Sequence, residues 1–328
     1  MENDNNKRPI FLTYEELINK LKNKGLIIVD KSKLLWYIKS YNYENIINKF
    51  NKPFYQNNGY KSKKYLQNSN SQMIIDFFNF NRSISSIIIN DLHTIEMKLS
   101  SSIAYKIMSI IKGPCLNLLI NESIIFNVKN KDFKDLQNEL INWRETPLYS
   151  LCLTWTFGMS IKVFNNLNNS IQQKILRNYF RQINNIKLDT FRYLLYSFKE
   201  LRNKISHNNV IYNFKLKKIN EIVYKIISKN ELVKNDKRIK EKTEKKVKKD
   251  LSKLPTSKYK LIDIVRIIAK VTNNQEIENL ISKQINKLKL SILNGFEQGN
   301  TKNVQHQSCE EAWNNICNFL GFTDELNI

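Results

Sequence analysis

The sequence predicts an all-α protein, and three observations favour that fold class. Apolar residues recur at spacings of three and four along most of the chain, whereas the alternation that marks a β-strand is weak. The 328 residues include only 7 glycines and 5 prolines, too few for many tight β-turns. The glycine motifs of dinucleotide-binding and P-loop proteins do not occur either, which excludes those two classes.

Two short helices are expected first. Thr13 is the predicted N-cap of the first helix, because Glu16 stands three residues later in capping-box position. Gly25 is expected to end that helix, since glycine readily adopts the left-handed conformation of a C-terminal cap. The second helix is expected over residues 31–42, and we interpret the polar residues 51–71 as a loop.

Helical periodicity dominates the rest of the chain, apart from the basic residues 234–253, where apolar residues are nearly absent. The further helical segments are expected at residues 73–89, 91–110, 133–143, 148–157, 160–167, 170–180, 188–207, 261–268, 277–288 and 313–322. The expected organisation is an N-terminal helical region at 1–70, a helical core at 71–230, a basic linker or solvated helix at 231–257 and a C-terminal helical region at 258–328.

The charge of the chain indicates a polyanionic partner. With 53 Lys and Arg residues against 30 Asp and Glu residues, the net charge of +23 favours RNA, DNA or an anionic membrane surface. No apolar run approaches the ~20 residues of a membrane span, and the N-terminus lacks a signal-peptide core, so we expect a cytoplasmic protein without membrane association. No cofactor or metal is expected, because neither the 3 histidines nor the 4 cysteines have ligand spacing.

Two basic segments are candidate RNA-binding elements. Residues 234–253 hold ten basic and four acidic residues, and the candidates there are Lys245, Lys246, Lys248 and Lys249. A solvated helix face is the alternative for this run. The second segment lies in and just before the polar loop and contains the candidates Lys61, Lys63 and Lys64. There, Lys49, Lys52 and these three lysines are interleaved with aromatic residues suited to base stacking: Tyr41, Tyr43, Phe54, Tyr55, Tyr60 and Tyr65. Ordinary packing of the loop would produce the same composition.

The helix expected at 188–207 carries the candidate chemistry. Its buried stripe is predicted from apolar residues at alternating spacings of three and four: Phe191, Leu194, Phe198, Leu201 and Ile205. At about 100° per residue, His207 falls roughly 150° from the centre of that stripe, with Asn203 one turn before it on the same side. Arg202 lies at the edge of the stripe. The alternative is an exposed histidine at a helix C-terminus, capped by Asn208 or Asn209.

The residues around this histidine form a distinctive pattern. Leu201-Arg202-Asn203, Ser206-His207-Asn208 and Ile211-Tyr212-Asn213 resemble the L-R-N-x-x-x-H…Y-N signature of HEPN ribonucleases, and more narrowly their abortive-infection (AbiD/AbiF-like) branch. Segments elsewhere resemble that family in the same order: Leu12–Glu16, Gly25–Ile28, Phe78–Arg82, Ile95–Glu96, Ile103–Tyr105, Pro147–Tyr149, Thr156–Gly158 and Trp313–Gly321. Three positions depart from it, since Ser100, Leu153 and Val210 replace charged residues that relatives commonly carry.

The resemblance implies a HEPN-type helical bundle at 71–230 and a metal-independent endoribonuclease of phage defence or of a toxin–antitoxin pair. Arg202, Asn203 and His207 would be catalytic, with His207 transferring protons and Arg202 holding the phosphate. Ser206 and Glu96 would support them, although Glu96 can instead form a surface ion pair with His93.

The implied partners are an RNA substrate, a regulatory or antitoxin RNA and a second copy of the chain in a homodimer. The charge surplus and the three departures also suit a different class, a non-catalytic RNA-binding scaffold that uses the same fold for dimerisation. A helical DNA-binding regulator is less well supported, because the sequence contains no helix-turn-helix pattern.

Overall fold

The computed structural model describes residues 11–56, 63–115, 122–130, 132–141, 145–215, 261–297 and 302–320. Within these ranges the chain is helical and forms no β-strand, only three isolated β-bridges, so the all-α prediction is confirmed. None of the described helices is long and apolar enough to cross a membrane. Lys61 and the run 234–253, with its four candidate lysines, lie outside the described residues.

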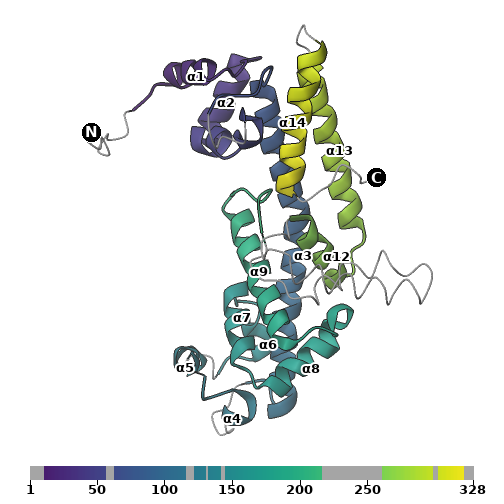
Figure 1. The fold of residues 1–328 in the computed structure, drawn as a ribbon. Coiled ribbons are helices and arrows are strands. Elements are labelled where there is room, and N and C mark those ends of the chain that lie inside the picture. The colour runs from purple at the N-terminus through teal and green to yellow at the C-terminus, as the bar shows by residue number, and fades with distance from the viewer. Residues whose placement is uncertain are drawn as a thin grey trace, which may run out of the picture. The chain divides into compact units, whose positions relative to one another are not determined.

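The chain divides into two compact units (Figure 1). The first unit consists of residues 1–83 and 282–328. Its described elements are α1 (Tyr14–Asn23), α2 (Lys31–Tyr41), the short helices η1 (Glu44–Asn48) and η2 (Lys52–Phe54), the beginning of α3 (Ser71–Ile111), the end of α13 (Glu276–Glu297) and α14 (Lys302–Leu320). Within this unit α14 packs on η2, and Asn315 donates a hydrogen bond to the Pro53 carbonyl at 3.0 Å.

The second unit consists of residues 84–281. It contains the remainder of α3, α4 (Glu122–Ile125), α5 (Phe133–Ile141), α6 (Leu148–Leu151), α7 (Phe157–Asn166), α8 (Asn169–Tyr179), η4 (Arg181–Ile183), α9 (Leu188–Ser206), α12 (Leu261–Thr272) and the beginning of α13. Both α7 and α8 pack against α9, while α12 packs against η4.

The predictions for the first two helices are confirmed. The Thr13 hydroxyl accepts from the Glu16 backbone, and the Glu16 carboxylate accepts from the Thr13 N–H at 2.7 Å, which completes the capping box. Gly25 follows the C-cap with φ of +91°, a conformation that favours glycine. Helix α2 ends at Tyr41, within one residue of the expected boundary.

The expected pair of helices at 73–89 and 91–110 is wrong, because α3 continues through Asn90 and Asp91 as a single helix of 41 residues. A stripe of fully buried residues crosses the expected break without interruption: Ile84, Ile88, Leu92, Ile95, Leu99 and Ile103. Asp91 is buried and accepts two hydrogen bonds from Asn274 of the α12–α13 turn, at 3.0 and 3.2 Å. A polar residue in the sequence here marks a tertiary contact rather than a helix end.

The helix expected at 148–157 is also shorter than predicted. Helix α6 ends at Leu151, and α7 begins at Phe157 with Thr156 as its N-cap, whose hydroxyl accepts from the Met159 N–H at 3.2 Å. The threonine cap starts a new helix, because it satisfies a backbone donor that has no partner within the helix.

Candidate active site

Helix α9 buries the predicted apolar stripe in the second unit. Phe191, Leu194, Phe198 and Leu201 are fully buried, and Ile205 is 8 % exposed. Phe191 contacts the rings of Phe164 on α7 and Phe180 after α8, with centroid distances of 5.5 and 4.8 Å. The opposite side of the last two turns faces solvent, so α9 presents its polar residues outward at its C-terminal end.

The helix ends in a Schellman motif, a common C-terminal cap. The Asn209 N–H donates to the Lys204 carbonyl at 2.8 Å, and the Asn208 N–H donates to the Ile205 carbonyl at 2.9 Å. Asn208 takes the left-handed conformation that this motif requires, with φ of +51°. The C-cap residue is His207 itself, and Asn208 and Asn209 follow it and supply the two backbone hydrogen bonds of the motif.

Beyond the cap the chain turns back into the core. Ile211 is fully buried, and Tyr212 and Phe214 are 2 and 3 % exposed. Burial raises the pKa of the Tyr212 hydroxyl well above its ordinary value. The apolar residues on both sides of the cap are thus anchored, and they hold the polar residues between them at the surface.

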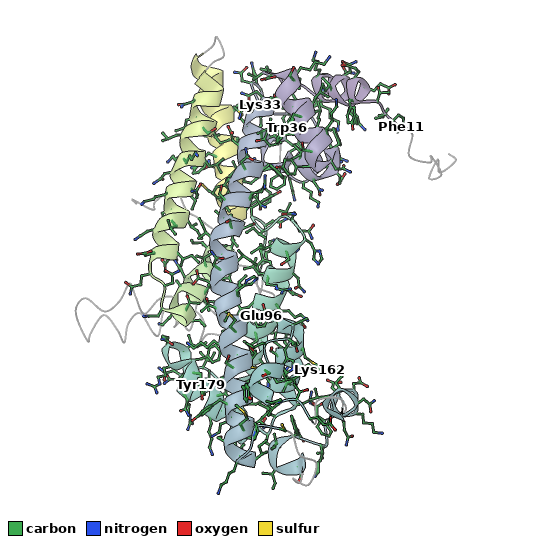
Figure 2. The ribbon with its side chains drawn as sticks, turned by 180° about the vertical axis from the view of Figure 1, so that it is seen from behind. Phe11, Lys33, Trp36, Glu96, Lys162 and Tyr179 are labelled. Carbon is green, nitrogen blue, oxygen red and sulfur yellow. The ribbon has the colours of Figure 1, made fainter. Side chains whose placement is uncertain are left out.

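Arg202 lies between α9 and α3. Its Nε is 3.6 Å from Glu96 Oε2, and its Nη1 donates to Asn203 Oδ1 at 3.3 Å. The Glu96 side chain is only 12 % exposed and the Arg202 side chain 29 % (Figure 2 labels Glu96 on α3). The Glu96 carboxylate on α3 therefore orients the Arg202 guanidinium on α9. Glu96 pairs with Arg202, not with His93 as in the alternative.

Arg202 retains donor capacity beyond these two contacts. Its Nε is buried and has no hydrogen-bond partner among the described residues, since 3.6 Å to Glu96 is an ion-pair distance only. A guanidinium carries five N–H donors in a planar fork that matches two oxygens of a phosphate. The buried Nε cannot reach a ligand, so the donors that remain for an anion are those of the terminal nitrogens.

Asn203, Ser206 and His207 are all exposed at the end of α9. Asn203 and His207 are four residues apart, on one side of the helix, and the His207 N–H donates to the Asn203 carbonyl at 3.1 Å. Arg202 and His207 are separated by about 7.5 Å along the axis, from five residues at 1.5 Å each. The structure thus brings Glu96, Arg202 and Asn203 into contact and leaves the His207 imidazole open to solvent.

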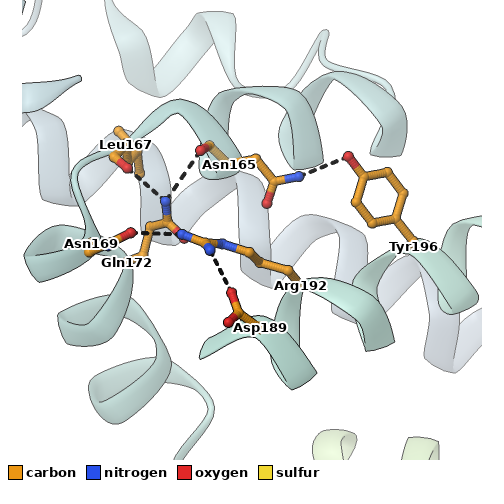
Figure 3. A network of polar contacts seen from close by, with 7 residues as sticks. All are labelled: Asn165, Leu167, Asn169, Gln172, Asp189, Arg192 and Tyr196. Atoms are coloured by element: carbon orange, nitrogen blue, oxygen red, sulfur yellow. Dashed lines mark hydrogen bonds and ion pairs between the residues drawn. The ribbon is translucent and has the colours of Figure 1, made fainter. Parts of the chain in front are cut away.

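A second polar network fixes the beginning of α9 (Figure 3). Each nitrogen of the Arg192 guanidinium donates to one oxygen on α8 or α9: Nε to Gln172 at 2.9 Å, Nη1 to Asp189 at 2.7 Å and Nη2 to Asn169 at 2.8 Å. Arg192 therefore crosslinks α8 and α9, fifteen residues before His207.

Gln172 is the buried member of this network, with no exposed surface. Its Nε2 donates to the Leu167 carbonyl at 2.6 Å and to the Asn165 carbonyl at 3.3 Å, at the end of α7. The Asn165 side chain in turn donates to the hydroxyl of Tyr196 on α9 at 2.9 Å, so the network also joins α7 to α9. Sequence reasoning missed this network, because a glutamine on α8 shows no pattern that reveals its partners on two other helices.

The three positions that depart from the family pattern have different surroundings. Ser100 is buried, and its hydroxyl donates to the Met97 carbonyl of the same helix at 3.1 Å, which gives this polar group a partner. Leu153 is 75 % exposed, and Val210 is half-buried directly after the α9 cap. None of these residues takes part in the contacts of Arg202 with Glu96 and Asn203, or in the hydrogen bond between His207 and Asn203.

In the polar loop after α2, the aromatic residues that the structure describes are buried. Phe54, Tyr55 and Tyr65 are at most 7 % exposed, and the rings of Tyr55 and Tyr65 lie 4.7 Å apart. Burial raises the pKa of both hydroxyls. For these three aromatic residues, the packing alternative is correct and the base-stacking interpretation is wrong.

Lys63 and Lys64 are exposed in this loop. The pKa of the neighbouring Lys24 is lowered, first by burial and then by the positive charges of Lys20 and Lys63. Lys63 therefore belongs to a small basic cluster with α1, although Phe54, Tyr55 and Tyr65 do not lie exposed beside it.

Within the described residues, no three His, Cys, Asp or Glu side chains are grouped closely enough to hold a metal ion. The sequence model of the Abi-like protein family matches residues 36–213, more than half of the 328-residue chain. The matched segment includes Glu96 and the whole of α9 with Arg202 and His207. No curated protein and no solved structure matches the chain.

Proposed function

The chain belongs to the Abi-like protein family, and on that premise we propose that it is a metal-independent endoribonuclease of the HEPN type. Its biological role would be abortive infection in phage defence, or the toxin function of a toxin–antitoxin pair. Within the family we assign it to the AbiD/AbiF-like branch, on the motif after Leu201.

The end of α9 is the observation that carries this proposal. Its apolar residues Leu201 and Ile205 are buried, whereas Asn203 and His207 are exposed and Arg202 is held against Glu96. A histidine that served only packing would lie on the buried stripe. Arg202 is held against Glu96, and Asn203 and His207 are exposed at the end of the same helix, with His207 about 7.5 Å further along its axis than Arg202.

The proposed reaction is attack of the ribose 2′-hydroxyl on the adjacent phosphorus. The imidazole of His207 accepts the 2′-hydroxyl proton, the 2′-oxygen bonds to phosphorus, and the bond from phosphorus to the 5′-oxygen breaks. The 5′-oxygen takes up a proton, and the products are a 2′,3′-cyclic phosphate and a 5′-hydroxyl. Arg202 stabilises the charge on the phosphoryl oxygens, and Asn203 orients either the guanidinium or the phosphate.

One imidazole cannot remove a proton and deliver another in the same step. A twofold homodimer that places two copies of His207 in one cleft would supply both groups, so we propose that the active form is a homodimer. The high positive charge of the chain would serve to hold the RNA.

The test is cleavage of RNA by the purified protein in the presence of EDTA, with analysis of the product ends. Wild type should produce cyclic phosphates, whereas His207→Ala and Arg202→Ala should not. Suitable controls are His93→Ala and Arg177→Ala, which remove an exposed histidine and an exposed arginine of the same unit. Equal cleavage by all five proteins would refute the assignment.

One observation favours a second candidate, a non-catalytic RNA-binding scaffold that uses the same fold to dimerise. Ser100 is buried and Leu153 exposed, at two positions where the family resemblance implies charged residues that would position the substrate. This candidate predicts salt-sensitive RNA binding without cyclic-phosphate ends, and the same binding after His207→Ala.

A further inference from the structure

An exposed tryptophan stands out on α2 in the first unit. Trp36 is 56 % exposed. The buried side of the same helix is formed by Leu34 and Ile38, which are at most 2 % exposed. A large aromatic ring left in solvent has no role in the core. Its surroundings determine what it can bind.

The Trp36 ring is part of a rigid cluster. It lies edge-on to Tyr37 and Tyr41 at centroid distances of 5.0 and 6.0 Å, and Tyr41 in turn packs 5.1 Å from Phe78 of α3. Edge-to-face contacts of this kind are favourable and fix the relative angles of the rings. Trp36 is therefore held by its neighbours while one part of the indole remains accessible.

Polar contacts fix the tyrosines of the cluster as well. Asn79 donates to the Tyr37 hydroxyl at 2.9 Å, and Arg82 donates to the Tyr41 hydroxyl at 2.7 Å. The Arg82 guanidinium also lies 4.9 Å from the centroid of the Tyr41 ring, a cation–π distance. Arg82 is exposed, so it adds a positive charge to this part of the surface.

Two lysines flank the tryptophan on the same side of α2. Lys33 and Lys39 lie three residues before and three residues after Trp36, and both are exposed (Figure 2 labels Lys33 and Trp36). They are separated by about 9 Å along the helix axis, from six residues at 1.5 Å each. The Lys39 ammonium also lies 5.4 Å from the ring centroid of Tyr14, which is 47 % exposed.

The carboxylates nearest in sequence do not neutralise these lysines. Helix α2 contains no acidic residue. The preceding Asp30 accepts from the Lys33 backbone N–H at 2.8 Å as the N-cap, and Glu15 forms an ion pair with Lys31 at 2.6 Å. Lys33 and Lys39 thus present two positive charges on either side of an accessible aromatic ring.

We propose that this side of α2, formed by Lys33, Trp36 and Lys39 and called the Trp36 face below, binds single-stranded RNA. One nucleobase stacks on the indole of Trp36, and the flanking phosphates pair with the two lysines. Stacking on an aromatic side chain beside backbone-pairing cations is the general chemistry of single-strand binding. A protein partner of apolar surface is disfavoured, because a single ring flanked on both sides by charged lysines offers little contiguous apolar area.

The inference rests on the proposed function, in that RNA is the ligand of both sites. Phe54, Tyr55 and Tyr65 are buried, whereas the tryptophan one helix earlier is not. The spacing Lys33–Trp36–Lys39 is the sequence signal that could have revealed the face.

The experiment measures fluorescence anisotropy of a labelled, unstructured RNA about 12 nucleotides long, bound to the full-length protein in a His207→Ala background. Trp36→Ala should weaken binding about tenfold, and Trp36→Tyr should retain most of the affinity. Trp36→Leu should behave like Trp36→Ala, because an apolar side chain does not replace a π-face. Leu290→Ala is the matched control, since Leu290 is an apolar residue of the same unit with 61 % exposure.

Two further measurements separate stacking from charge. Lys33→Gln should reduce the slope of log affinity against log salt by about 0.7, whereas Lys22→Gln on α1 should have a smaller effect. A duplex RNA of the same sequence should bind equally to wild type and Trp36→Ala, because its bases are not available for stacking.

The inference is overturned if Trp36→Ala binds the single strand as Leu290→Ala does, or if Trp36→Leu binds it as wild type does. Failure of the proposed function has a different signature. If no variant or wild type cleaves RNA but Trp36→Ala weakens binding, the Trp36 face stands and the nuclease assignment falls. If cleavage depends on His207 but Trp36→Ala leaves RNA binding unchanged, the nuclease assignment stands and the Trp36 face falls.

Discussion

The end of α9 and the Trp36 face place polar and aromatic residues at the surface by different means. On α9, the capping motif and the buried residues on both sides of it determine where Arg202 and His207 lie, and Glu96 orients the guanidinium. On α2, the ring of Trp36 is exposed and is fixed only by neighbouring side chains.

This difference separates two requirements of an RNA-cleaving protein. Chemistry requires a few groups at fixed positions, whereas binding of a flexible strand requires accessible rings and unneutralised charge. Variants at the two regions should therefore affect different measured quantities, and the predictions below test that separation.

The largest effect is expected at the end of α9. His207→Ala should lower the cleavage rate by about 10²–10⁴-fold, the usual contribution of a general acid–base group, and should leave the Kd for a short single strand unchanged. Single-turnover cleavage and anisotropy on the same RNA measure the two quantities. A parallel loss of binding in His207→Ala, but not in His93→Ala, would show that the two regions are not separable.

Removal of the buried Gln172 amide, which links α8 to α7 and α9, should have the next largest effect. Gln172→Ala leaves the Leu167 carbonyl and Arg192 Nε without their buried partner, which should destabilise the protein by about 2 kcal/mol. Urea unfolding measures the change. Asn169→Ala is the control, because it removes an exposed partner of the same guanidinium and should cost much less. Equal costs would mean that burial of the network contributes nothing.

The Trp36 face should affect substrate binding alone. Trp36→Ala should raise KM for single-stranded RNA about tenfold and leave kcat at the wild-type value, because stacking is made equally in the ground state and the transition state. Initial rates over a range of RNA concentrations separate the two constants. A fall in kcat at unchanged KM would place Trp36 in the reaction rather than in binding.

Local features of both regions could be predicted from the sequence. The capping box of Thr13 and Glu16, the buried stripe on α9 and the asparagines after His207 depend on neighbours at most five positions apart. Backbone hydrogen bonds and helical periodicity act over that distance, so spacing alone determines them.

Long-range features could not be predicted in this way. Whether Glu96 meets His93 or Arg202 depends on how α3 packs on α9, which no local spacing determines. Composition likewise did not distinguish the buried Tyr55 and Tyr65 from the exposed Trp36, because lysines surround all three in the sequence. The family resemblance located Arg202 and His207, but the support from Arg192 and Gln172 became visible only in the packed structure.

The left-handed residue of the α9 cap offers a smaller test. Asn208 has φ of +51°, so Asn208→Gly should be tolerated, whereas Asn208→Ala should cost about 1 kcal/mol. Urea unfolding of the two variants measures the difference. The same pair should be compared in the cleavage assay, where lower activity in Asn208→Ala than in Asn208→Gly would show that the cap positions His207. Equal stability of the two variants would contradict a strained cap at this residue.

The smallest effect is expected in the first unit, at the cap of α1. Hydrogen bonds from the Thr13 backbone and hydroxyl lower the pKa of Glu16 below its ordinary value. Its contribution to stability should therefore be present above the ordinary glutamate pKa and be lost as the pH falls from there through the lower folded pKa. Glu16→Gln keeps the capping box without the titration, so the Tm difference between wild type and this variant should shrink or reverse over that interval.

In a Thr13→Ala background the pH dependence of the difference should disappear, because the two hydrogen bonds that lower the pKa are weakened together. If the dependence persisted there, another group near α1 would be responsible, and the cap would not be the source of the lowered pKa.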